Sequence, residues 1–87
     1  MLRLSRTSQG PGETVLKVEG QILADCVEVL EKECLELLGR DRRVLLDLGE
    51  VNYLDSRSAH VLRTLAADRV AIVNCSPLLQ ELLAEAS

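Results

Sequence analysis

The most constraining feature of the sequence is a short apolar run followed closely by a series of helix-capping residues, within residues 43–64. The apolar run, residues 44–48, is too short for a helix before Gly49, so it predicts a central strand buried on both faces. A turn is expected at Gly49, after which the chain returns to the core. Residues 55–58 then offer several helix caps in a row, so we expect a helix to begin there and to pack an apolar side on the sheet.

The rest of the chain predicts a hairpin followed by alternating helices and strands. Gly and Pro in residues 9–12 separate two stretches of weakly alternating polarity, which is typical of a hairpin. Asp25 is the expected N-cap of the first helix and Gly39 its stop, while Ser76 and Pro77 predict the start of the last helix. The expected elements are strands at residues 2–6 and 13–19, a crossing at 20–23, a helix between 25 and 39, a strand at 44–48, a short helix after 55, a turn at 67–68, a strand at 70–73 and a helix from 77 to 86.

This order predicts an α/β fold, because buried strands that alternate with helices pair in parallel through right-handed crossovers. The hairpin adds an antiparallel neighbour. We therefore expect a single domain over residues 1–87, with a mixed β-sheet and α-helices packed against it. The helix residues expected to face the sheet are Leu23, Val27, Leu30, Cys34 and Leu37 or Leu38 in the first helix, Ala59, Val61, Leu62, Leu65 and Ala66 in the second, and Leu78, Leu79, Leu82, Leu83 and Ala86 in the last.

Composition excludes several function classes. Hydrophobic residues make up 47% and charged residues 28%, which are ordinary values for a folded domain. The single aromatic residue, Tyr53, and the net charge of −4 disfavour a nucleic-acid binder, which needs stacking platforms or a basic surface. The apolar runs are only a few residues long and no signal-peptide pattern follows Met1, so we expect a cytoplasmic protein without direct membrane insertion.

The residues able to carry chemistry do not form a catalytic pattern. Cys26, Cys34 and Cys75 contain no C-x-x-C pair, so neither a disulfide framework nor a zinc site is indicated. We interpret all three as small buried hydrophobes, with a reactive Cys75 as the alternative. His60 follows Ser58 by two positions and so points to another side of the helix. We therefore expect no enzyme, no cofactor and no metal.

Two charged segments have simple interpretations. Glutamates dominate the outer face of the first predicted helix, and we interpret that face as solvated surface. Arg40, Arg42 and Arg43 lie within four residues and could meet an anion. Because a connection between a helix and a buried strand is often charged merely through exposure, we interpret these arginines as an exposed loop.

Three segments resemble the STAS domain, the small fold shared by anti-sigma factor antagonists and the cytoplasmic tails of sulfate transporters. They are residues 18–23, 44–56 and 70–77, and the resemblance runs from Leu16 to Leu83. The middle segment is the most specific, because a hydrophobic strand ending in Asp-Leu, a short turn and Asp-Ser at a helix start is the family's most recognisable feature. The resemblance implies a bacterial signalling domain that docks on another protein.

The family motif usually reads Asp-Ser-Ser/Thr-Gly, and a partner kinase that is itself the anti-sigma factor phosphorylates its third residue. Asp55 and Ser56 match this motif, but Arg57 stands in the third place and Ser58 in the fourth. The fixed positive charge of Arg57 cannot imitate a phosphoserine, which carries about −1.5 to −2 charges. Ser56 and Ser58 remain candidate phosphorylation sites, although cap and helix-surface roles explain both.

Two classes of function follow from the resemblance and the residues. The first is an interaction module resembling an anti-sigma factor antagonist without the usual phosphorylation switch, or alternatively an accessory STAS subunit that docks on the ATPase of an ABC-type membrane transporter. The second is a small enzyme or ligand carrier that uses Cys75, His60 or an anion site at the second helix. The expected partner-binding residues are Asp55, Ser56, Arg57, Ser58 and Ala59.

Overall fold

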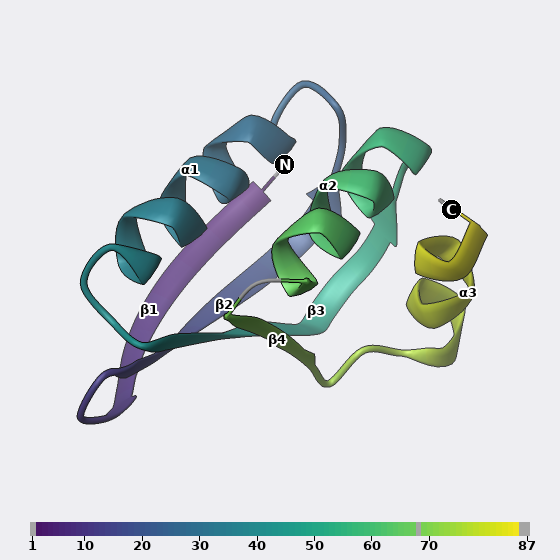
Figure 1. Ribbon diagram of the computed structural model, residues 1–87. Helices are drawn as coiled ribbons and strands as arrows, with labels where there is room; N and C mark the ends of the chain where they lie inside the picture. Colours follow the sequence, from purple (N-terminus) through teal and green to yellow (C-terminus); the bar gives the residue numbers. More distant parts are fainter. Residues whose placement is uncertain (1, 68, 86–87) are drawn as a thin grey trace.

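The computed structural model describes residues 2–67 and 69–85 and contains a four-stranded mixed sheet with helices packed against it (Figure 1). The strand order is β1-β2-β3-β4, with β1 antiparallel to β2 and the other neighbours parallel. The predicted α/β fold is therefore confirmed. The elements are β1 (Leu2–Gly10), β2 (Glu13–Ile22), α1 (Val27–Leu38), β3 (Arg43–Leu54), α2 (Ser56–Ala66), β4 (Val70–Val73) and α3 (Pro77–Glu85).

The core lies between the helices and one face of the sheet. Side chains alternate across a strand, and in β3 Val44, Leu46 and Leu48 are buried whereas Leu45 is half-buried. In Figure 1, α1 and α2 lie side by side over the sheet and α3 lies beyond α2. The expectation that the central strand is buried on both faces is wrong. The described helices and the buried side chains of β3 form one hydrophobic cluster on one face of the strand, and Leu45 on the other face is only half-buried.

Strands β2 and β3 both extend further than expected. The crossing predicted at residues 20–23 is largely strand, because β2 continues to Ile22, which pairs with Leu54. The turn predicted at Gly49 is also wrong. Its backbone N–H donates to the Asp47 carboxylate at 2.9 Å, and the strand continues through an irregularity in the pairing with β2. Such an irregularity shifts which residues face inward, so Val51 and Leu54 reach the core.

Helix α1 begins later than its sequence suggests. Asp25 is not the N-cap; Cys26 takes that position and makes no side-chain cap bond, and the first helical residue is Val27. The Cys26 thiol instead bonds the Leu23 carbonyl at 3.3 Å. Only Cys34 is a fully buried cysteine; Cys26 and Cys75 are half-buried, which corrects the expectation that all three lie in the core.

The second and third helices differ from expectation in length and facing. At 11 residues, α2 has the ordinary length of a helix rather than the short one predicted. Ala66, expected to face inward, is exposed. Helix α3 starts as predicted, with the Ser76 hydroxyl accepting from the Leu79 N–H at 3.2 Å, but Leu78 is 55% exposed and Leu79 alone is fully buried. The predictions for Asp68 and Ala86 fall outside the described residues.

Candidate functional site

The motif segment, residues 55–59, lies where α2 begins at the carboxyl ends of the parallel strands β2 and β3. Asp55 is the N-cap of α2, as predicted, and its Oδ1 accepts from the Ser58 backbone N–H at 2.8 Å. Side-chain acceptors are favoured at this position because the first N–H groups of a helix have no partner within the helix. Asp55 therefore fixes the point at which the helix starts.

The second oxygen of Asp55 joins the motif segment to the chain between β2 and α1. Its Oδ2 accepts from the Ala24 backbone N–H at 2.7 Å, and the Asp55 N–H donates to the Ile22 carbonyl at 3.2 Å. One carboxylate thus holds two loops that are 31 residues apart in sequence. Both bonds to the carboxylate have the short lengths of charge-assisted hydrogen bonds.

These contacts act on the charge of Asp55. Burial raises the pKa of its carboxyl, but hydrogen bonds from Ser58 and Ala24 and the nearby charge of Arg57 together lower it more, so the pKa lies below its ordinary value of 3.8. Asp55 is therefore ionised near neutral pH. The Ser58 hydroxyl contributes through its proximity to the carboxyl, since its Oγ has no partner in good hydrogen-bond geometry among the described residues.

Arg57 gives the motif segment an exposed positive charge. Its side chain is 65% exposed, and Nη2 lies 3.7 Å from Oε1 of Glu28, which is in the first turn of α1. An exposed pair of this kind is worth only about 0–1 kcal/mol, because solvent screens both charges. Arg57 can therefore exchange Glu28 for a carboxylate or phosphate of a partner at little cost.

The five predicted partner-binding residues do not share one surface. Ser56 and Arg57 are exposed, and Asp55 is half-buried. Ser58 and Ala59 have no exposed area, so the predicted helix-surface role of Ser58 is wrong. The helical period explains this, because Ser58 precedes Leu62 by one turn and so lies on the stripe of α2 that faces the core. That spacing is visible in the sequence and could have revealed the burial.

The motif surface also includes residues that the sequence reasoning did not place there. Glu28 approaches Arg57 from α1, and Ala24, with the exposed Asp25 next to it, is brought beside α2 by the Asp55 carboxylate. Neither contact has a local sequence signal, because both depend on how α1 and α2 pack. The exposed rim of the site therefore combines two acidic side chains with one arginine.

The alternative chemical groups are not joined to this site. His60 is exposed and Cys75 is half-buried, and no hydrogen bond or ion pair among the described residues links either side chain to Asp55. Burial raises the pKa of the Cys75 thiol, which disfavours the reactive thiolate. Within residues 2–67 and 69–85, no group of three or more potential metal ligands gathers, and no helix is both long and apolar enough to cross a bilayer.

A mixed sheet with helices packed against it and an exposed helix start at the strand ends define a small α/β domain built around residues 55–59. The chain belongs to the STAS domain family: residues 5–87 match the family model described as "Mlab, STAS domain". No curated protein matches the sequence.

Solved structures with the same fold include two forms of one regulator. The anti-sigma factor antagonist SpoIIAA in its unphosphorylated form has a TM-score of 0.69 and 16% identity, covering 94% of this chain and 82% of that protein. The Bacillus cell fate determinant SpoIIAA in the phosphorylated form has a TM-score of 0.71 and 13% identity, covering 98% and 84%. The STAS domain of an antisigma-factor antagonist from Rhodobacter sphaeroides has a TM-score of 0.62 and 20% identity, covering 98% and 94%. At these identities the likeness concerns the fold.

Proposed function

We propose that this protein is a regulatory interaction module of the anti-sigma factor antagonist type, acting in the cytoplasm without enzymatic activity and without the usual phosphorylation switch. The observation that carries the proposal is the exposed Arg57 at the start of α2, on a loop fixed by Asp55. A fixed loop with an available guanidinium suits recognition of a partner's carboxylate, because the bidentate geometry of arginine matches that group.

The proposed lack of a phosphorylation switch is supported by the burial and exposure of the two serine hydroxyl groups beside Arg57. Ser58 is completely buried, so a kinase could reach its hydroxyl only if the start of α2 opened. Ser56 is exposed and is the remaining hydroxyl of the motif that an enzyme could reach in the folded domain. We propose that Ser56 is not the regulated position and that Arg57 engages the partner constitutively. SpoIIAA, by contrast, is known in unphosphorylated and phosphorylated forms.

The test is a quantitative pull-down from the native cells with three baits: the unaltered chain, Arg57→Glu and the control Arg40→Glu. Arg40 is an exposed arginine in the connection to β3, at the opposite end of that strand, so its reversal matches the charge change without touching the motif. We expect one regulator of the anti-sigma kinase type to be lost at least tenfold with Arg57→Glu and retained with Arg40→Glu, since reversing a central interfacial charge costs on the order of 2 kcal/mol or more.

Three results would contradict the proposal. Equal recovery of every partner with both variants would remove Arg57 from the interface. Mass spectrometry of the bait would show whether Ser56 or Ser58 carries phosphate in a substantial fraction of molecules, and such phosphate would refute the constitutive mode. Specific capture of a transporter ATPase in place of a sigma-factor regulator would overturn the antagonist role and assign the chain as an accessory subunit.

A further inference from the structure

The described helices cover only one face of the sheet. Their buried residues join those of β2, β3 and β4 in one hydrophobic cluster (Figure 1). Successive side chains of a strand point to opposite faces, so the residues that alternate with this cluster lie on the other face. Parallel strands such as β2, β3 and β4 are usually covered on both faces. The face that carries Leu45, here the open face, therefore lacks the layer that such strands normally have.

The centre of the open face is apolar. The strand register places Val15 beside Leu45 and Leu45 beside Ala71, and Val73 lies two residues further along β4. All four residues are only half-buried. Valine and leucine are among the residues most often fully buried in proteins. The centre of the open face is thus an apolar patch across three strands, with no described helix above it.

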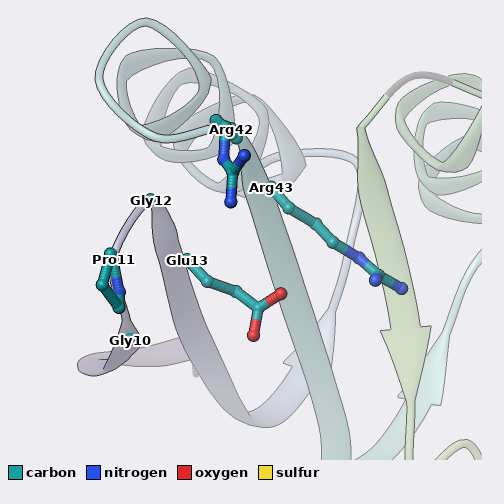
Figure 2. Close-up of a pocket in the computed structure, with 6 residues that line it drawn as sticks. All are labelled: Gly10, Pro11, Gly12, Glu13, Arg42 and Arg43. Carbon is teal, nitrogen blue, oxygen red and sulfur yellow. The ribbon is translucent and has the colours of Figure 1, made fainter.

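Charged side chains surround this centre and balance one another. The open-face positions of the described strands include three basic and three acidic residues: Arg3, Lys17, Arg43, Glu13, Glu19 and Asp47. At one end, the two Glu19 oxygens lie 3.7 Å from Arg3 Nε and from Lys17 Nζ. At the other end, Glu13 and Arg43 are register partners and border an open cavity at the β1–β2 turn, with Arg43 reaching toward β4 (Figure 2). These charges sum to zero, although the whole chain has a net charge of −4.

The charge balance favours a second copy of the chain as the partner of this face. A strongly acidic or basic partner would meet no net opposite charge there, whereas two neutral faces with interspersed charges meet without net repulsion. An apolar centre with a polar rim is also the usual anatomy of a protein interface. We propose that two copies pack open face to open face, so that their sheets form a sandwich with the helices outside.

The size of the open face suits a weak dimer. Strands about 4.8 Å apart, with a rise of about 3.3 Å per residue, give it a projected area of roughly 400 Å². The accessible surface of its side chains is larger, so the two copies together bury about 1,000 Å², near the lower limit for a specific interface. We therefore expect a dissociation constant in the micromolar range.

The dimer leaves the motif segment accessible. Residues 55–59 lie at the start of α2, which packs on the covered face of the sheet, so each copy presents its Arg57 on the outside of the sandwich. The dimer is bivalent for any partner of the motif segment. Its formation does not depend on Arg57 or on the proposed function.

The experiment is analytical ultracentrifugation of the full chain at concentrations up to about 1 mM, which covers the weak interfaces of this size. We expect a reversible dimer of twice the 9.6 kDa monomer mass. Leu45→Asp places a charge at the centre of the interface in both copies and should weaken the dimer at least about a hundredfold. The matched control Leu35→Asp makes the same change at a side chain of α1 that is 54% exposed, and it should leave the dimer unchanged.

A second variant tests the interface without touching a half-buried residue. Thr7 is exposed on β1 and pairs with Val15, so Thr7→Arg adds a bulky charge to the open face and should weaken the dimer at least about tenfold. Circular dichroism identifies the folded variants, and Thr7→Arg decides if Leu45→Asp does not fold. A monomer at every concentration, assembly beyond a dimer, an unchanged dimer in a folded open-face variant or loss of the dimer with Leu35→Asp would overturn the proposal.

Discussion

Replacing Asp55 offers the sharpest test of how the motif segment is built. Asp55→Ala removes both the bond to the Ser58 N–H at 2.8 Å and the bond to the Ala24 N–H at 2.7 Å. Loss of an N-cap costs about 0.5–2 kcal/mol. The second bond, from the Ala24 N–H to the half-buried carboxylate, is worth about 1 kcal/mol, because solvent screening reduces the usual contribution of a hydrogen bond to a charged group. We expect a total loss of about 2 kcal/mol in the free energy of unfolding.

Asp55→Ser separates the two contributions, because serine caps a helix but is too short to bridge to Ala24. It should cost about 1 kcal/mol, half the loss in Asp55→Ala. Asp25→Ala is the matched control: Asp25 is an exposed aspartate in the adjoining loop and forms no described hydrogen bond or ion pair. Its effect should stay within about 0.5 kcal/mol.

Urea unfolding followed by circular dichroism measures these differences, and for a domain of this size 2 kcal/mol corresponds to roughly 10 °C in melting temperature. Because the folded-state pKa of Asp55 is lowered, its stabilising effect is fully present above the ordinary pKa of 3.8 and is lost as the pH falls through the lower, folded-state value. The deficit of Asp55→Ala should therefore be constant near neutral pH and shrink in acid. A loss no larger than that of Asp25→Ala, or one independent of pH, would refute the bridging role.

Two other predictions test the core. Leu46→Asp places an unpaired charge at a site with no exposed area and should unfold the domain. The control Leu45→Asp changes the preceding residue of β3, which is half-buried on the opposite face, and should still fold cooperatively. A circular dichroism spectrum of a folded Leu46→Asp variant would show that the faces of β3 are misassigned. Burial raises the pKa of the Cys34 thiol to about 11, so its contribution to stability is complete below pH 9.0 and is lost as the pH rises from there through about 11. Iodoacetamide should therefore alkylate the buried Cys34 far more slowly than the half-buried Cys26 at pH 8. Equal alkylation rates would contradict the burial of Cys34.

The element order was predictable because its signals are local. A run of apolar residues before Gly49, the Asp55 cap and the Ser76-Pro77 start depend on neighbours within a few positions, and the fold follows from their order. The errors have a common cause. Asp25 is as good a cap residue as Asp55 by type, yet α1 starts after it, because Cys26 and Val27 bond back to the Leu23 carbonyl. Backbone hydrogen bonds within the turn from Leu23 to Val27, and not the residue type at position 25, therefore set the start of α1.

The candidate site was predictable in position but not in composition. The position comes from Asp55 and the helix start, which are adjacent in sequence. The contacts that shape its surface, from Ala24 and Glu28, come from 31 and 29 residues away and depend on the packing of α1 beside α2. The cavity at Arg42 and Arg43 is a similar case, because charge in a loop does not indicate that a glycine turn lies opposite it.

The geometry assigns different roles to the two motif residues that a partner would meet first. Asp55 uses both carboxylate oxygens inside the protein, so little of its hydrogen-bonding capacity remains for a partner. Arg57 has one weak contact, to Glu28, and most of its surface is exposed. Asp55 therefore sets where the loop lies, and under the proposed function Arg57 is the side chain that contacts a partner. Because residue 57 is exposed and its ion pair with Glu28 is weak, its identity can change without loss of the fold, so a fold of this kind can present different side chains at this position.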